Sequence, residues 1–176
     1  MSGHNKWSKI KHKKAATDAA KSKVFGKFSR LIAVESKKAG GNVDSPGLRA
    51  VIDQAKAVSM PADNIDRAVK KGAGGDTANM EEVMYEAYGP GGSALIITGL
   101  TDNKNRTSAE VKHSLSKYGA ELAAQGAASW AFAKDGPDWV PNSMIPLSDE
   151  DGEKLGNIIE ALEESDDVQN VYTNAD

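Results

Sequence analysis

Positive charge is concentrated near the start of the chain, between His4 and Arg30. This stretch carries eight lysines and one arginine against a single acid, Asp18. Cations at this density neutralise the phosphates of a polyanion and release its counterions, and Trp7 among them can stack on an unpaired base. The residues that we expect to contact nucleic acid are Lys6, Trp7, Lys9, Lys11, His12, Lys13, Lys14, Lys21, Lys23, Lys27 and Arg30.

The same stretch also permits a simpler interpretation. Runs of one charge are usually solvated faces, so these residues could form a solvated basic arm with Trp7 as its hydrophobic anchor. His4 and His12 fit such an arm better than they fit the role of catalytic bases. This stretch alone therefore leaves both phosphate contact and plain solvation open.

The two halves of the chain carry opposite net charge. Residues 1–75 have a net charge of +10 and residues 76–176 a net charge of −13, which together give the −3 of the whole chain. This asymmetry predicts a basic N-terminal domain over 1–75 and an acidic domain over 76–176, with a glycine-rich joint at 72–76. The basic domain can dock on phosphate. Alternatively the halves attract each other, and the salt dependence of binding separates the two interpretations.

The composition excludes several kinds of chemistry. The chain has no cysteine, so disulfides, thiolate nucleophiles and cysteine-based zinc sites are excluded. Its three histidines are scattered and it has neither an HExxH nor a GxSxG motif, so we expect no enzyme activity, no metal and no cofactor. No apolar run is long enough to span a bilayer, and the N-terminus lacks the apolar core of a signal peptide. We therefore expect a cytoplasmic protein without a membrane partner.

Apolar residues at helical spacing predict three helices in the basic half. The first covers about 22–38 and ends before Gly40, where a left-handed C-cap is favourable. The second begins at Ser45-Pro46, a capping serine followed by a proline whose missing N–H costs nothing there. The third covers 61–72. Three short amphipathic helices are expected to bury their apolar faces in one small bundle.

In the acidic half, alternating and β-branched runs predict strands. Strands are expected at 83–88, 94–100, 129–134, 144–147 and 168–173. One helix is expected behind a capping box at 107–110, and another behind a cap at 148–151. Residues 135–142 contain two prolines and should form an irregular connection. The order ββαββαβ predicts an α+β domain in which helices cover one face of a mostly antiparallel sheet.

A polar loop lies between the second strand and the following helix. Asp102, Asn103, Asn105 and Arg106 could contact a partner there. Loops of this composition more often bond their own backbone. The structural role is therefore the stronger expectation.

Long segments of the chain resemble the YebC/PmpR family. The opening GHNKWSKIKHKK is similar to the start of that family's sequences. DNIDRAVKKGAGG, MYEAYGPGGSALI and LTDNKNRTSAEVKHSLSKYG are similar to later family segments in the same order. The resemblance runs through nearly the whole chain, and several long motifs in one order make it specific.

The resemblance implies a regulatory protein that binds nucleic acid through its basic domain. Family members are commonly described as probable transcriptional regulators that bind DNA, whereas related members look like ribosome-associated translation factors that would contact ribosomal or transfer RNA. Both uses require docking on phosphate, so the motifs decide between neither. A protein-interaction adaptor, with a basic partner on the acidic half, is a further alternative, and the oligomeric state stays open.

The resemblance also implies that this chain is a short form. Family members usually have a third domain inserted between the counterparts of Lys134 and Met144. Only residues 135–143 occupy that place here. Any family activity that depends on the third domain is therefore in question for this chain.

Overall fold

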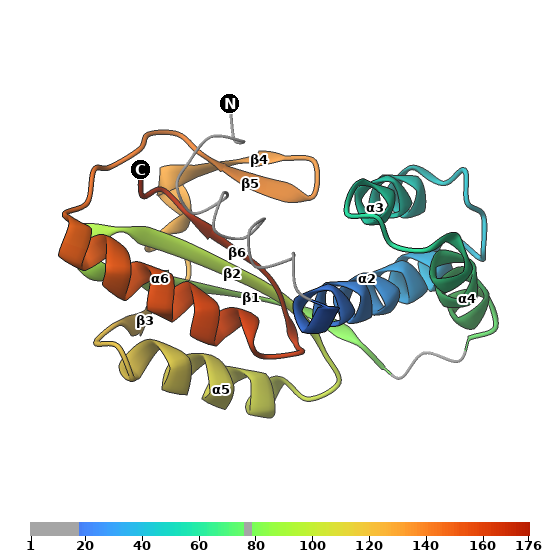
Figure 1. The fold of residues 1–176 in the computed structure, drawn as a ribbon, viewed down its shortest axis with the longest axis horizontal. Helices are drawn as coiled ribbons and strands as arrows, with labels where there is room; N and C mark the ends of the chain where they lie inside the picture. The colour runs from blue at the N-terminus through green and yellow to red at the C-terminus, as the bar shows by residue number, and fades with distance from the viewer. Residues whose placement is uncertain (1–17, 76–78) are drawn as a thin grey trace. The chain divides into compact units, whose positions relative to one another are not determined.

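The computed structural model describes residues 18–75 and 79–176 of the chain. Among them, one compact unit ends at Glu81 and a second begins at Glu82. The first unit is helical and the second combines helices with strands (Figure 1). This confirms the predicted α+β class, with a helical region before a region that contains the sheet.

The helical unit contains three described helices, as predicted. They are α2 (Asp18–Lys38), α3 (Pro46–Ala57) and α4 (Ala62–Ala73). Helix α2 ends before Gly40 and Gly41, whose φ angles of 60° and 81° are left-handed values that glycine adopts without strain. Helix α3 has Pro46 in its first turn, but the side chain of Ser45 makes no capping hydrogen bond. Ser45 therefore occupies the predicted N-cap position, and its backbone oxygen accepts from the N–H of Arg49, but the predicted side-chain cap is not made.

Helices α2 and α4 pack closely along their length. A Cβ atom on Gly72 would lie 2.2 Å from the carbonyl oxygen of Ala33, so only glycine fits at this contact. The buried hydroxyl of Ser36 donates a hydrogen bond to the carbonyl oxygen of Val69, at 2.6 Å. The core of the unit is made of Ile32, Leu48, Val51, Ile52, Ala55, Met60, Ile65 and Ala68.

The second unit is built on a four-stranded sheet with the order β3-β1-β2-β6. Its strands are β1 (Glu81–Tyr88), β2 (Ala94–Thr101), β3 (Glu121–Ala123) and β6 (Val168–Thr173). Strands β1 and β3 pair antiparallel, as do β2 and β6, with a bulge between Thr98 and Gly99. The turn between β1 and β2 contains the short 3-10 helix η1 (Pro90–Gly92).

Both faces of the central strand β2 are covered. Helices α5 (Lys104–Ser116) and α6 (Asp149–Glu163) cover one face, where Leu95 and Ile97 join their cluster. On the other face, Ala94 and Ile96 pack on Ala128, Ala131 and Phe132. Burial on both sides explains why β2 begins with the unbroken apolar run 94–97. The packing of α5 and α6 in one cluster confirms that the helices share one face.

The region between α5 and α6 differs from the prediction. The expected strand over 129–134 begins as a 3-10 helix, η2 (Ser129–Ala131), and continues as β4 (Phe132–Asp135). The expected irregular connection contains β5 (Asp138–Pro141), which pairs antiparallel with β4 in a hairpin. Gly136, at φ 59°, makes the tight turn possible in spite of the neighbouring proline.

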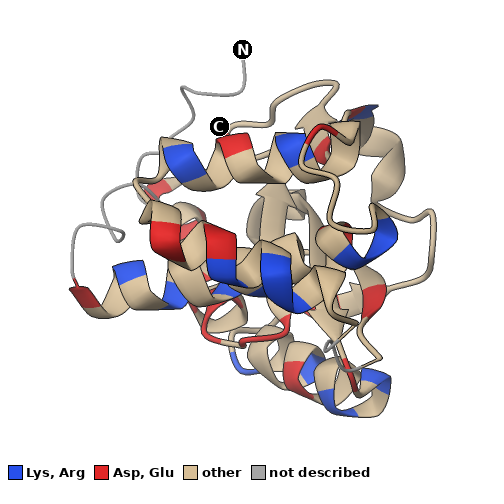
Figure 2. Cartoon of the chain, turned by 90° about the vertical axis from the view of Figure 1, so that its right-hand side faces the viewer, with Lys and Arg blue, Asp and Glu red and all other residues tan. Residues whose placement is uncertain are grey.

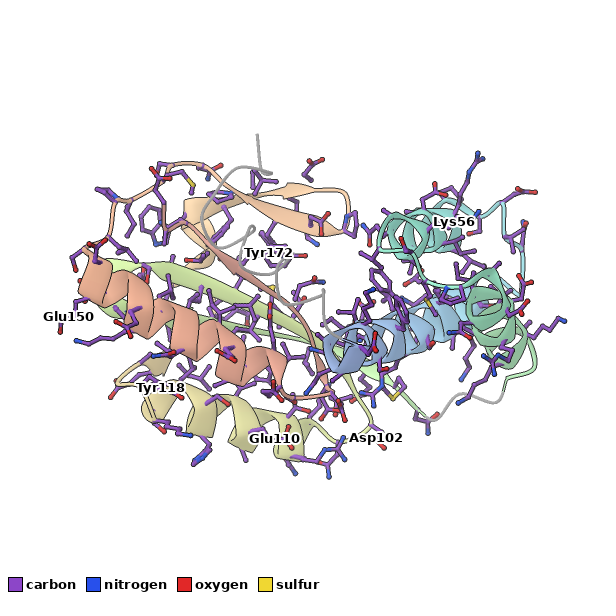
Figure 3. All side chains as sticks on the ribbon, viewed as in Figure 1. Lys56, Asp102, Glu110, Tyr118, Glu150 and Tyr172 are labelled. Carbon is purple, nitrogen blue, oxygen red and sulfur yellow. The ribbon has the colours of Figure 1, made fainter. Side chains whose placement is uncertain are left out.

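Cross-strand contacts stabilise this hairpin. Lys134 lies 4.9 Å from the ring centre of its partner Trp139. Tyr172 of β6, labelled in Figure 3, donates its hydroxyl to Asp138 at 2.9 Å, and burial together with this bond raises the pKa of the tyrosine. The strand predicted at 144–147 is absent, and only Ile145 forms a single parallel bridge, to Ala175.

Candidate functional site

The predicted nucleic-acid contacts divide into two groups. Seven lie outside the described residues: Lys6, Trp7, Lys9, Lys11, His12, Lys13 and Lys14. The other four lie on α2, and the described helices α3 and α4 also carry lysine and arginine residues, which are blue in Figure 2. Lys23, Lys27 and Arg30 are spaced by four and three residues, which places them on one face of the helix. Lys21 falls on a different side and is exposed, whereas the other three are half-buried.

A groove of about 640 Å³ lies between α2 and α4. From α2 it is lined by Phe25, Ser29, Arg30 and Ala33, among others, and from α4 by Asn64, Arg67, Ala68 and Lys71. We call it the α2–α4 groove. The structure thus brings one predicted residue, Arg30, to the same surface as Arg67 and Lys71, which were not predicted as contacts. The sequence could have indicated them, because Asn64, Arg67 and Lys71 are spaced by three and four residues and so share one face of α4.

The described lining of the groove is positive. It contains Arg30, Arg67 and Lys71, and no aspartate or glutamate is among the described residues that line it. Arg67 donates hydrogen bonds to the side-chain oxygen of Asn64 and to the carbonyl oxygen of Asp63, both of them neutral acceptors. Arg67 and Lys71 are exposed. This surface suits an anionic ligand, because a guanidinium offers a planar set of donors that matches phosphate.

Two lysines of the helical unit are explained by the helix that carries them. At the end of α2, the ammonium group of Lys38 lies 2.9 Å from the carboxylate of Glu35. Lys37 and Lys38 lie in the last turn of α2, where positive charge interacts favourably with the helix dipole. These two lysines therefore have a structural explanation that requires no ligand.

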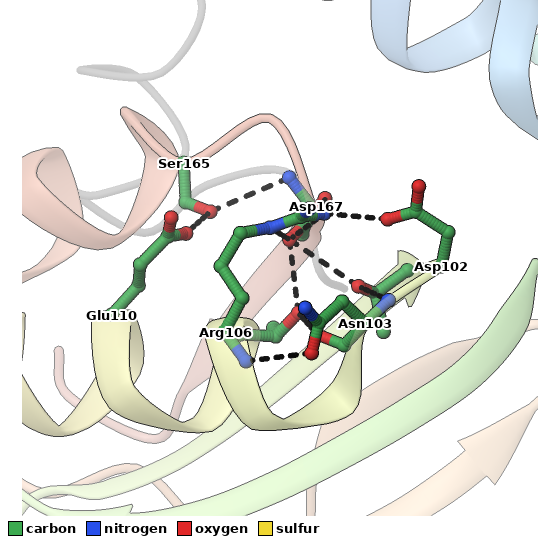
Figure 4. Close-up of polar contacts among 8 residues, drawn as sticks. Asp102, Asn103, Arg106, Glu110, Ser165 and Asp167 are labelled. Carbon is green, nitrogen blue, oxygen red and sulfur yellow. Dashed lines mark hydrogen bonds and ion pairs between the residues drawn. The ribbon is translucent and has the colours of Figure 1, made fainter.

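The polar loop after β2 forms a closed network (Figure 4). Asp102 pairs with Arg106 at 2.7 Å, and the side chain of Asn103 accepts a hydrogen bond from the backbone N–H of Arg106. Arg106 also donates to Asp167, which is 3% exposed and accepts from Thr107 at 2.9 Å. The hydrogen bonds to Asp102 and Asp167 raise the pKa of Arg106. These contacts join the start of α5 to the turn before β6 and favour the structural role.

The capping box predicted for α5 is wrong. Asn103 caps the helix, which begins at Lys104, three residues before Thr107. Glu110 instead accepts a hydrogen bond from the hydroxyl of Ser165, at 2.7 Å, and so helps to hold α5 against the turn after α6. The cap predicted for α6 is confirmed, because Ser148 accepts from the N–H of Asp151.

A second buried carboxylate, that of Glu86, lies on β1. It is 4% exposed and accepts hydrogen bonds from the backbone N–H groups of Gly126, Ala128 and Ser129. Burial alone would raise its pKa, but the hydrogen bonds together outweigh burial and lower it. The three donors satisfy the charge, so this carboxylate fixes the loop before η2.

The described ranges contain neither a metal-binding cluster nor a membrane-spanning helix. Among residues 18–75 and 79–176, no three histidine, aspartate or glutamate side chains are grouped so that they could hold a metal ion. Within the same ranges, no helix combines the length and apolarity needed to cross a membrane.

Two family models match the chain. One, described as the TACO1/YebC protein N-terminal domain, matches residues 5–75. The other, described as the TACO1/YebC second and third domain, matches residues 80–137 and 135–175. Together they account for both units of the fold.

Relatives and a solved structure agree with these matches. A probable transcriptional regulatory protein of Hahella chejuensis is 38% identical over 237 positions, covering 100% of this chain and 96% of the relative. This chain has 176 residues, so that relative has residues with no counterpart here. A protein of the same description from Fervidobacterium nodosum is 50% identical over 152 residues, covering 85% of this chain and 60% of the relative. The crystal structure of a conserved hypothetical protein from Aquifex aeolicus matches with a TM-score of 0.83 and 33% identity, covering 98% of this chain and 97% of that one.

Proposed function

This chain belongs to the TACO1/YebC family, and from that premise we propose that it is a regulatory protein that binds nucleic acid through its helical unit. The observation that carries the proposal is the α2–α4 groove, whose described lining holds Arg30, Arg67 and Lys71 without a carboxylate. The lysine-rich residues 4–30 add positive charge to the same half of the chain. We propose a binding role and not an enzymatic one, as expected from the sequence.

Charge removal at the groove tests this proposal. Arg67→Gln/Lys71→Gln should weaken binding to a labelled nucleic acid and lower the slope of log affinity against log salt by about two, because each lost phosphate contact removes about one. Fluorescence anisotropy over a range of salt concentrations measures both quantities.

The chain offers a matched control on α3. Arg49→Gln/Lys56→Gln removes the same two residue types from exposed positions that are not among the described groove residues, and Lys56 is labelled in Figure 3. This variant should keep most of the affinity, apart from the general loss of positive charge. Equal losses in the two double variants would contradict a contact at the groove. A wild-type protein that binds no nucleic acid at moderate salt would overturn the proposed function itself.

DNA and RNA remain alternatives within this proposal. A transcriptional regulator would prefer its own promoter over random DNA, whereas a translation factor would sediment with ribosomes. Both assays should be run on the wild type and on Arg67→Gln/Lys71→Gln. Loss of ribosome sedimentation in that variant, with no preference among DNA sequences in the wild type, would favour the translation factor.

A second candidate function, docking of a protein partner, is favoured by one observation on the acidic unit. Trp130 is 66% exposed, and its indole N–H is held by the carbonyl oxygen of Ala127 at 2.8 Å and by the hydroxyl of Tyr88 at 3.1 Å. Exposed, oriented aromatic residues are frequent centres of protein interfaces. Trp130→Ala should abolish capture of a basic partner or self-association in light scattering. Unchanged behaviour would count against this candidate.

A further inference from the structure

The α2–α4 groove has the size and lining of a site for one nucleotide. Its volume of about 640 Å³ lies within the roughly 300–1,000 Å³ that small-molecule sites occupy. Building on the proposed function, we infer that the groove takes one unpaired nucleotide, with its base against Phe25 and its phosphate on Arg67 and Lys71. The protein then binds an unpaired strand more tightly than a duplex of the same sequence.

Phe25 supplies the surface for the base. Its side chain packs partly against the core of the helical unit and also lines the groove. An aromatic ring that packing holds in place loses little freedom when a base stacks on it. Stacking accepts any base, because every base has a flat π-face. Ala33 and Ala68 extend this apolar lining, and their small side chains leave room for the base.

Arg67 and Lys71 supply the surface for the phosphate. They are four residues apart on α4, so their side chains share one face of the helix, and both are exposed. The bonds from Arg67 to Asn64 and to the carbonyl of Asp63 orient the guanidinium and leave its charge intact. A guanidinium has five N–H donors, so others remain for a phosphate oxygen.

The walls of the groove are held apart at a fixed distance. The contact of Gly72 with Ala33 and the 2.6 Å bond from Ser36 to Val69 fix how closely α2 and α4 approach. The groove is therefore formed before a ligand arrives, which lowers the entropic cost of binding.

This lining favours an unpaired strand over two other anionic ligands. In a duplex the bases are stacked and paired, so the face that Phe25 would contact is hidden, and only phosphate contacts remain. An acidic peptide supplies negative charge, but it lacks the flat base that accompanies each phosphate in a nucleic acid. A nucleic-acid strand with unpaired bases satisfies both the apolar and the cationic parts of the groove.

Anisotropy titrations with a short labelled strand, as DNA and as RNA, and with the matching duplexes test the inference. The wild type should bind the unpaired strand about tenfold more tightly than the duplex, as expected for one stacked base. Phe25→Leu should remove most of this preference by weakening the binding of the unpaired strand, and should leave the salt slope unchanged because no phosphate contact is lost. The DNA and RNA arms then show which sugar the site accepts.

Phe28→Leu is the matched control. Phe28 packs against the same core but is not among the described residues that line the groove, so this variant reproduces any loss of packing without removing the stacking surface. If Phe25→Leu fails to fold, Lys71→Gln and Lys70→Gln replace the pair, because both lysines are exposed and only Lys71 lines the groove. Lys71→Gln should weaken strand binding several-fold more than Lys70→Gln does.

Several outcomes would overturn the inference while nucleic-acid binding stands. One is equal affinity of the wild type for strand and duplex. Another is an equal effect of each groove variant and its control. Complete displacement of the strand by a glutamate-rich peptide of the same charge would show that the groove selects charge alone. A wild-type protein that binds neither strand nor duplex would instead refute the proposed function.

Discussion

Asp167 is the residue whose replacement should destabilise the α+β unit through one identifiable network. Its side chain is 5% exposed and accepts hydrogen bonds from Arg106, Thr107 and Thr101. Its backbone oxygen also accepts from Leu100 at 2.8 Å, a contact that Asp167→Asn leaves in place. Asparagine keeps the shape of the side chain but presents N–H donors where the neighbours also donate, and it removes the charge that faces Arg106.

The magnitude follows from the exposure of the two partners. Removing one member of a buried ion pair costs about 3–5 kcal/mol. Arg106 is 44% exposed and keeps its 2.7 Å bond to Asp102, so water and Asp102 recover part of this loss. We therefore expect Asp167→Asn to lower the free energy of unfolding by about 2 kcal/mol.

Urea denaturation followed by tryptophan fluorescence measures this change. Trp130 and Trp139 lie in the α+β unit, and a Trp7→Phe background removes the third tryptophan of the chain. The control is Asp135→Asn, the same substitution at an exposed residue of β4 in the same unit, which should cost less than about 0.5 kcal/mol. In a double-mutant cycle, Arg106→Gln and Asp167→Asn should couple by about 1–2 kcal/mol. Equal losses for the two asparagine variants, or a coupling near zero, would refute the reasoning.

Two further predictions concern Glu86 and the glycines of the helical unit. Glu86→Gln should lower the free energy of unfolding by about 2 kcal/mol at neutral pH, because hydrogen bonds to a charged acceptor contribute about 1.5–3 kcal/mol. Folding lowers the pKa of Glu86, so its contribution is complete above the ordinary value of 4.5 and is lost as the pH falls through the folded-state pKa. The difference between wild type and variant in urea should therefore shrink in acid, and a difference independent of pH would contradict this. Gly72→Ala should destabilise the helical unit by about 1–3 kcal/mol, since its Cβ would lie 2.2 Å from the oxygen of Ala33. Gly26→Ala, with nothing within 4 Å, should stabilise α2 by about 0.5–1 kcal/mol. Thermal unfolding followed by circular dichroism compares the stabilities of Gly72→Ala and Gly26→Ala. Changes in stability of the same sign in both variants would count against the packing argument.

Several elements were predictable because their signals are local. The end of α2 before Gly40, the proline start of α3 and the cap of α6 at Ser148 each depend on a few adjacent residues. Strand β2 was predictable because burial on both faces leaves the apolar run 94–97 at its start. The family motifs are local in the same sense, since each is a continuous segment.

Other elements depend on contacts that no local pattern encodes. Strand β3 has three residues, too few to show a period, and exists because β1 supplies its hydrogen-bond partners. Strand β5 forms at residues that end in a proline because Phe132 and its neighbours on β4 pair with it. Glu110 matches a capping box, yet it bonds Ser165, which is 55 residues away in the chain.

The sequence alone determined the α+β class, the division of charge and the resemblance to one family, because composition, periodicity and continuous motifs carry these properties. It also predicted phosphate as the ligand chemistry, a prediction that depends on how many cations the basic half holds. Only the tertiary structure decided which of the described cations share a surface. Arg30 lines the same groove as Arg67 and Lys71 because Gly72 lets α4 pack closely on α2. No local sequence pattern encodes such an approach between distant segments.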